Sequence, residues 1–213
     1  MADCSKTGGL ARSRLNYRCH VCAFFHSRED EYKILIPFVK EGLDAGDKAV
    51  QIIAADRRAE QIRRLTETGV DALAAEQRGQ LVVRTWEDSV LRGGRFDQYA
   101  MIGALQEIGA DGEQRSGITR IWANMGWALG DFPGVHDIVE YESRLNYVLP
   151  KYDIAAVCTY DLTQFSTSVV MDVLRTHPQT LVGKVLRENP FYVLPDEFLT
   201  ELRGGSATVP DVE

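Results

Sequence analysis

Residues 19–54 decide the fold class of this chain, and they read CHVCAFFHSREDEYKILIPFVKEGLDAGDKAVQIIA. The apolar run at 19–25 predicts a strand, and Ser27 after it predicts the N-cap of a helix. Apolar residues recur three or four positions apart along that helix, which Pro37 is expected to kink. A second β-rich run follows at 48–54. The order of strand, amphipathic helix and strand is typical of a parallel sheet covered by helices.

The same alternation continues along the rest of the chain. The run at 154–159 is apolar without interruption, as in a strand buried on both faces. Further strands are expected at 80–85, 118–125 and 180–186. Further helices are expected over 138–149, from Pro195 and after the predicted N-caps Asp56, Asp97 and Ser166. We therefore predict one α/β domain over residues 17–203, with a mostly parallel central sheet and helices on both faces. Residues 1–16 predict a flexible leader, and residues 204–213 predict a flexible tail.

The composition narrows the class of protein. A net charge of −7 argues against a surface that neutralises nucleic-acid phosphates, so we expect no direct binding of nucleic acid. No apolar run approaches the roughly 20 residues of a membrane span, and the N-terminus has no hydrophobic signal core. We therefore expect no membrane association and a cytoplasmic location. In a reducing compartment the four cysteines are expected to be free thiols or metal ligands.

Polar and aromatic side chains follow the ends of several predicted strands. In an open α/β sheet, ligands bind beyond the carboxyl ends of the parallel strands. We therefore predict a ligand pocket there. Its expected lining residues from the strand ends are His26, Trp86, Glu87, Asn124, Trp127, Tyr160 and Asp161. The alternative is structural: the carboxylates cap helices and the tryptophans fill the space between layers.

The segment RCHVCAFFH at 18–26 concentrates two thiols and two imidazoles. Alternation along a strand places His20 and Cys22 on one face, where they could line a pocket for an organic ligand together with Cys158. The same three residues, His20, Cys22 and Cys158, could instead bind a metal ion, although a structural zinc site normally needs four ligands. No other cofactor is expected.

The places where a nucleotide-binding α/β protein carries its machinery hold other residues here. The phosphate loop after the first strand is replaced by FFHSREDE at 24–31, which offers neither a glycine-rich amide cradle nor a lysine. The fourth predicted strand ends in Ala123, Asn124 and Met125, without a carboxylate for magnesium. The chain also contains no GxSxG nucleophile motif. We therefore expect a protein that is not an enzyme.

Long stretches of the chain, spanning about residues 18–203, resemble the MEDS family of prokaryotic sensory domains, the type found in the repressor DcmR. The stretches that carry the resemblance are HVCAFFHSREDEYKILIPFVKEGLDAGDKA (20–49), RTWEDSVLRGGRFD (84–97), ANMGWAL (123–129), VEYESRLNYVLPKYDIAAVCTYDL (139–162) and VMDVLRTHP (170–178). The resemblance implies a KaiC/RecA-like core without its phosphate-binding loop. It also implies the sensing of simple hydrocarbon derivatives, with the family's H-x-C signature at His20, Val21 and Cys22.

Three functional hypotheses follow. The first is a stand-alone sensory domain that binds a small organic, hydrocarbon-derived ligand and signals through a partner protein. That partner would be a histidine kinase or a transcription regulator, since no predicted segment outside the domain is long enough for a helix-turn-helix module. The second is a metal- or thiol-redox-dependent regulator that uses the Cys/His cluster of the first strand. The third is an uncharacterised enzyme. The chain could also form a homodimer.

Overall fold

The computed structural model describes residues 18–113 and 117–205. The predicted leader at 1–16 lies outside these residues, as does the predicted tail from residue 206 onward. Gly204 and Gly205, which were expected to begin the tail, end the last helix. Within the described residues, no helix is long and apolar enough to cross a membrane.

The centre of the molecule is a seven-stranded sheet in the order β3-β2-β4-β5-β1-β6-β7. All neighbouring strands run parallel except β6 and β7, which form an antiparallel hairpin at one edge. The strands are β1 (Cys19–Phe25), β2 (Lys48–Ile53), β3 (Leu81–Thr85), β4 (Thr119–Asn124), β5 (Ile154–Asp161), β6 (Gln179–Val182) and β7 (Val185–Glu188). This arrangement confirms the predicted α/β class and mostly parallel sheet.

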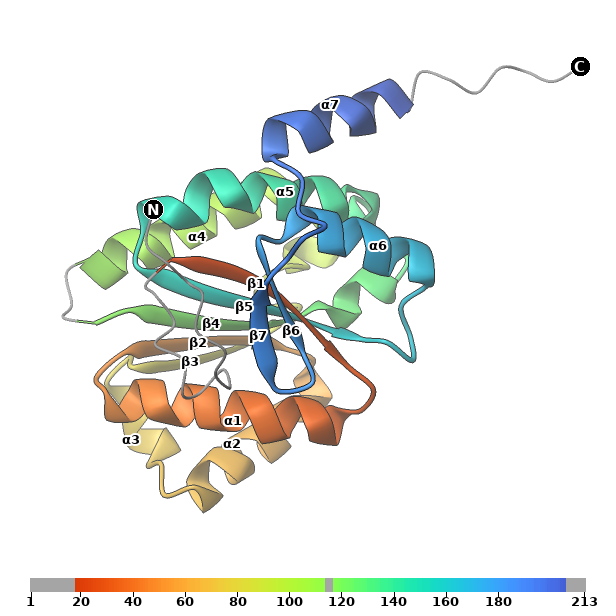
Figure 1. The fold of residues 1–213 in the computed structure, drawn as a ribbon. Helices are drawn as coiled ribbons and strands as arrows, with labels where there is room; N and C mark the ends of the chain where they lie inside the picture. The colour runs from red at the N-terminus through yellow and green to blue at the C-terminus, as the bar shows by residue number, and fades with distance from the viewer. Residues whose placement is uncertain (1–17, 114–116, 206–213) are drawn as a thin grey trace, which may run out of the picture.

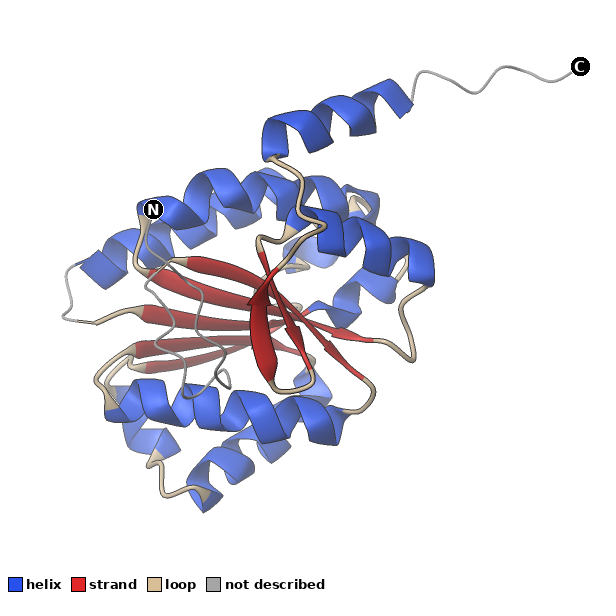
Figure 2. Ribbon diagram, in the orientation of Figure 1, coloured by secondary structure: helices blue, strands red, loops and turns tan. Residues whose placement is uncertain are grey.

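Helices cover both faces of the sheet (Figures 1 and 2). One face carries α1 (Arg28–Asp44), α2 (Arg58–Glu67) and α3 (Ala72–Gln77). The other carries α4 (Gln98–Glu113), α5 (Ile138–Val148) and α6 (Thr167–Thr176), and α7 (Pro195–Gly205) packs over α5. Short 3₁₀ helices lie at Ala55–Arg57, Arg92–Gly94, Met125–Leu129, Val135–Asp137 and Leu149–Lys151.

Strand alternation divides the interior into two cores. On β1, Val21 and Ala23 enter the core beneath α1, whereas Cys22 and Phe24 enter the core beneath α5. On β5 the same division sends Val157 to the α1 side and its neighbours Ala156 and Cys158 to the α5 side. The sheet therefore separates two buried environments, and the face on which a residue lies decides which other residues it can reach.

The structure departs from the predicted elements in three places. Asp56 was expected to cap α2, but it lies inside a 3₁₀ turn, and α2 begins at Arg58 without a side-chain cap. The short helix α3, capped by Asp71, was not predicted. The single strand expected at 180–186 is a hairpin, because a turn at Gly183 divides it into β6 and β7.

Candidate functional site

Four buried side chains from four different segments meet between the sheet and α5. His20 lies on β1, Cys158 on the adjacent strand β5 and Glu142 on α5, while His177 directly follows α6. Their exposed fractions are 3%, 4%, 0% and 0%, respectively. We call these four residues the buried cluster. The parallel register of β1 and β5 points His20 and Cys158 to the same face, and α5 lays Glu142 across them.

Glu142 is the centre of the buried cluster. Its Oε2 atom lies 3.0 Å from His20 Nε2, 3.3 Å from His177 Nε2 and 3.7 Å from Cys158 Sγ. Its other oxygen, Oε1, accepts a hydrogen bond of 3.1 Å from the hydroxyl of Tyr160. The Tyr160 contact fixes the orientation of the carboxylate, so that Oε2 alone faces the two imidazoles and the thiol.

The outer nitrogens of both imidazoles face oxygen atoms. His177 Nδ1 lies 2.8 Å from the backbone oxygen of Val173, and His20 Nδ1 lies 3.1 Å from Asn146 Oδ1. The side-chain nitrogen of Asn146 donates to the backbone oxygen of Thr176 at 2.7 Å. The side-chain oxygen of Asn146 is therefore the atom that faces His20. Because these two oxygens can only accept, Nδ1 carries a proton in each ring. A neutral ring then directs the lone pair of Nε2 at Glu142.

The electrostatics of the buried cluster call for a positive charge at its centre. Burial disfavours the charged form of Glu142, but the contacts with His177 and His20 outweigh burial and lower its pKa. Burial, together with the neighbouring His177, lowers the pKa of His20 and so favours a neutral ring. A proton or a cation between Oε2 and the Nε2 atoms would balance the charge of an ionised Glu142.

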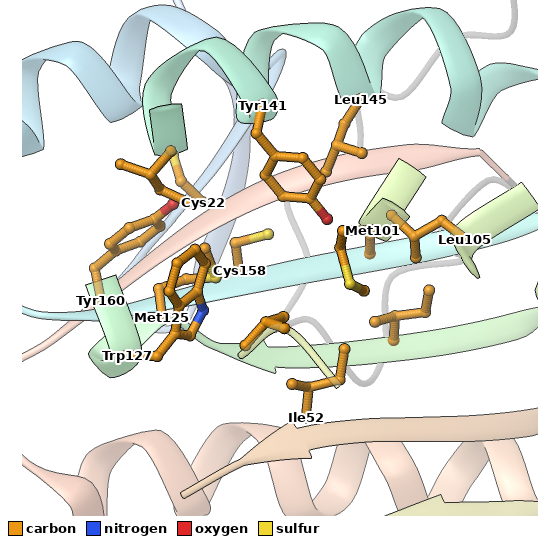
Figure 3. Close-up of a cluster of buried hydrophobic side chains, with 14 of the residues drawn as sticks. Cys22, Ile52, Met101, Leu105, Met125, Trp127, Tyr141, Leu145, Cys158 and Tyr160 are labelled. Carbon is orange, nitrogen blue, oxygen red and sulfur yellow. The ribbon is translucent and has the colours of Figure 1, made fainter. Parts of the chain in front are cut away.

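A small, mainly apolar cavity adjoins the buried cluster. Its volume, counted as the space open to the centre of a water molecule, is about 30 Å³, and Glu142 and Cys158 form part of its wall. Figure 3 shows Cys158 and several apolar side chains of the lining between the strands and the helix that carries Tyr141 and Leu145. The apolar lining includes Ile52, Met101, Leu105, Ile121, Met125 and Trp127.

Several predicted site residues lie on this α5 side of the sheet. His20, Cys158 and Tyr160 belong to or contact the buried cluster, and Trp127 lines the cavity. Cys22 is also buried here, but its thiol donates to the backbone oxygen of Gln179 at 3.6 Å, and burial raises its pKa to about 12. The predicted metal set of His20, Cys22 and Cys158 is therefore brought together only in part, because Cys22 is not among the clustered ligands.

Asn124 points to the opposite face of the sheet. Its amide nitrogen donates to Glu31 Oε1 at 3.2 Å, within a polar group on the α1 side. Trp86 is half-buried, and its indole donates to the backbone oxygen of Asn124 at 3.1 Å. The sheet thus separates Asn124 from the buried cluster.

The remaining predicted residues lie at the surface. His26 is exposed and lines an open hollow of about 230 Å³, and Glu87 is exposed. Asp161 accepts hydrogen bonds from the backbone and hydroxyl of Thr163 and from Gln164, so it shapes the loop after β5. Of the residues expected to surround one pocket, Asn124, Tyr160 and Asp161 line a small pocket of about 10 Å³ at the ends of β4 and β5, and the others lie elsewhere.

Glu142 and His177 were not predicted as site residues. Glu142 lies four residues after Ile138 and three before Leu145, so it shares the buried face of α5. A carboxylate at such a position in an apolar helix face is unusual, and that signal could have identified it. His177, which precedes a proline at a helix end, carries no comparable signal.

Comparisons with known proteins identify relatives of this chain. Residues 19–178 match the MEDS family, described as MEthanogen/methylotroph, DcmR Sensory domain. The transcriptional repressor DcmR of Methylorubrum extorquens is 28% identical over 176 residues, which are 80% of this chain and 62% of the repressor. The chain thus spans less than two thirds of the length of that relative.

Two solved structures share the fold. A KaiC-like protein from Pyrococcus horikoshii superposes with a TM-score of 0.57 at 12% identity, covering 81% of this chain and 80% of that protein. The flagellar accessory protein FlaH from Methanocaldococcus jannaschii gives a TM-score of 0.58 at 9% identity, covering 87% and 84%. These two matches confirm the predicted KaiC-like architecture. Because the family match covers most of the chain, the protein belongs to the MEDS family of sensory domains.

Proposed function

We propose that this sensory domain binds a small, weakly polar organic molecule in the cavity beside the buried cluster and signals through a partner protein. The observation that carries the proposal is the composition of the cavity wall. It is apolar on most sides, and Tyr141, Glu142 and Cys158 supply polar groups. Small-molecule sites commonly combine an apolar lining with a few polar groups that orient the ligand.

The size of the cavity limits both the ligand and its affinity. A volume of about 30 Å³ accommodates a molecule of only a few non-hydrogen atoms unless the lining moves. At a ceiling of about −1.5 kcal/mol per non-hydrogen atom, four atoms yield at most about −6 kcal/mol. That free energy corresponds to a dissociation constant in the range of tens of micromolar. We therefore expect a sensor of micromolar to millimolar concentrations.

A larger hollow on the surface suits such a ligand less well. It has a volume of about 270 Å³, and its lining includes Arg84, Arg92, Arg95 and Glu107. Much of the lining of this hollow is polar or charged, which favours water or ions over a weakly polar molecule. The mainly apolar cavity beside the buried cluster is therefore the better candidate.

The similarity to a transcriptional repressor supports a role for this domain in regulating a partner protein. The repressor DcmR matches this chain over 62% of its own length, so the chain shares a sensory part with a transcriptional regulator. We propose that ligand binding selects one conformation of the domain, and that a histidine kinase or transcription regulator recognises it. The domain itself would carry out no catalysis.

Methyl NMR spectroscopy tests the ligand site. Ile52, Met101 and Met125 line the cavity and carry methyl groups, whereas Ile36 lies in the core on the other side of the sheet. Titration with methanol, ethanol, 1-propanol and the matching chloroalkanes should produce saturable shifts at the cavity methyls for at least one compound. The Ile36 signal should stay in place.

Two variants provide the control. Ala156→Val adds carbon to the cavity wall and should weaken the saturable shifts at least tenfold, whereas Met101→Leu keeps a similar volume and should preserve those of Ile52 and Met125. The proposal fails if no compound gives saturable shifts, or if Ala156→Val binds as well as the wild type.

A further inference from the structure

Four of the six distances between the ligand atoms of the buried cluster are close to the edges of a metal-centred tetrahedron. A tetrahedral ion with bonds of about 2.0 to 2.1 Å to nitrogen and oxygen and about 2.3 Å to sulfur holds N and O ligands about 3.3 Å apart, and S about 3.6 Å from N or O. The two nitrogen-to-oxygen distances at Glu142 are 3.0 and 3.3 Å. Cys158 Sγ lies 3.7 Å from both His20 Nε2 and Glu142 Oε2. All four ligand atoms lie within 4.8 Å of one another.

The surrounding hydrogen bonds prepare the four atoms as ligands. The Nδ1–H groups of His177 and His20 donate to the oxygens of Val173 and Asn146, respectively. The Nε2 lone pair of each imidazole is therefore directed toward the centre of the buried cluster. Tyr160 orients the carboxylate through its other oxygen. Metal-binding histidines and carboxylates are typically held by such outer contacts.

One of the inward lone pairs has no partner. His177 Nε2 is fully buried and has no hydrogen bond of acceptable geometry within the described part of the chain, although Glu142 Oε2 lies 3.3 Å away. A single proton on His20 would satisfy Glu142 but would leave His177 Nε2 facing the carboxylate. A cation at the centre would satisfy all the inward atoms at once.

We propose that His20, Glu142, Cys158 and His177 bind a divalent transition-metal ion, with Zn²⁺ as the best fit. The inference goes beyond ligand sensing and does not require the organic ligand. Two neutral imidazoles, one carboxylate and one thiolate balance the charge of a divalent ion, as a site without access to water requires. Binding converts the Cys158 thiol to a metal-bound thiolate and releases one proton to solvent.

The ligand set identifies the class of metal. Imidazole and thiolate ligands in a four-coordinate site suit Zn²⁺ and related late transition metals, whereas Mg²⁺ and Ca²⁺ prefer six or more oxygens. Four protein ligands also close the site, which is typical of structural rather than catalytic zinc. Because Glu142 and Cys158 also border the cavity, the ion would tie β1, β5, α5 and the end of α6 together next to the organic ligand.

Cobalt substitution and metal analysis of the full chain test the site. Protein refolded under reducing conditions with excess Zn²⁺ and then desalted should retain one zinc per chain by mass spectrometry of the metal. Refolding with Co²⁺ should give the visible bands of tetrahedral cobalt and a near-ultraviolet band from thiolate-to-cobalt charge transfer.

Cys22→Ser is the matched control, because Cys22 is a buried thiol paired with Cys158 across the same two strands but is outside the buried cluster. Cys22→Ser should retain the full metal content and the charge-transfer band. Cys158→Ser should lose the band, and Glu142→Gln should lower the affinity for zinc at least tenfold in competition with a chelator. If Cys158→Ser does not fold, the comparison of wild type with Cys22→Ser still decides whether a thiolate other than Cys22 binds cobalt.

The proposal is overturned if folded wild-type protein retains no stoichiometric zinc or cobalt. It is also overturned if the cobalt spectrum lacks thiolate charge transfer, or if Cys22→Ser abolishes that band. Each of these outcomes would leave the methyl shifts at the cavity unaffected, so failure of the metal site is distinguishable from failure of the ligand site.

Discussion

Glu31 and Glu142 are buried carboxylates on opposite faces of the sheet, and their partners differ. Glu31, in the first turn of α1, is only 4% exposed. It accepts hydrogen bonds of 2.6 Å from Arg57, 3.0 Å from the Trp122 indole and 2.5 Å from Thr159. A guanidinium already balances the charge of Glu31, whereas the partners of Glu142 are two imidazoles and a thiol. Among the described residues, a guanidinium therefore pairs with Glu31, whereas Glu142 pairs only with histidines.

Removal of Arg57 should destabilise the protein, because it leaves the buried carboxylate of Glu31 without a positively charged partner. Arg57→Met keeps much of the side-chain volume but leaves Glu31 without its cation, so we expect a loss of about 3 kcal/mol in the free energy of unfolding. Urea denaturation followed by circular dichroism measures the loss. As a control, Arg63→Met removes an ion pair with Glu67 between exposed side chains, which should cost less than about 1 kcal/mol. Equal effects of the two substitutions would contradict this account of Glu31.

At the scale of secondary-structure elements, the two aspartates predicted as helix N-caps differ in their observed roles. Both Asp56 and Asp97 were predicted as N-caps. Asp97 accepts from the backbone amides of Tyr99 and Ala100 at 3.0 and 3.1 Å, as a cap should. Asp56 instead contacts Arg28 across the surface at 3.3 Å. The same residue type before a helix can therefore have two different structural roles.

Alanine substitution should distinguish these roles. Asp97→Ala removes the acceptor for two otherwise unpaired amides and should destabilise the protein by about 1 kcal/mol. Asp56→Ala breaks only a surface ion pair and should change stability by less than about 0.5 kcal/mol. Thermal and urea unfolding of the two variants measure the difference. A larger loss from Asp56→Ala than from Asp97→Ala would show that the assignment of the caps is wrong.

The strands were predictable because buried strands appear in the sequence as short runs of mainly apolar residues. The predicted 19–25 and the observed β1 coincide, and the predicted fourth strand at 118–125 exceeds β4 by one residue at each end. The division of 180–186 into a hairpin depends on a turn conformation at Gly183 that the apolar pattern does not reveal. Short helix α3 contributes too few residues to show a helical period.

The candidate site was predictable only in part, for a geometric reason. Strand alternation correctly places His20 on the same face as Cys22, and the pairing of β1 with β5 brings Cys158 to that face. Glu142 and His177 reach the same point through the packing of α5 and α6, which depends on contacts between residues more than 100 positions apart in the case of His20 and Glu142. No local pattern records such contacts.

At the scale of the whole molecule, the fold is shared with a KaiC-like protein. In nucleotide-binding α/β proteins, phosphate is held at the carboxyl ends of the parallel strands. Ser27, the N-cap of α1, accepts from the amide of Asp30, and the first turn of α1 carries Glu29, Asp30 and Glu31. A helix N-terminus ordinarily attracts phosphate, but three carboxylates there repel it. β4 ends in Asn124 and not in an acidic residue, and the nearby carboxylate of Glu31 is already paired with Arg57. We therefore expect isothermal titration calorimetry with Mg-ATP to detect no binding tighter than about 1 mM, a free energy weaker than about −4 kcal/mol. A dissociation constant in the low micromolar range, or steady phosphate release by the purified chain, would show that the domain has a nucleotide function and would count against a purely sensory role.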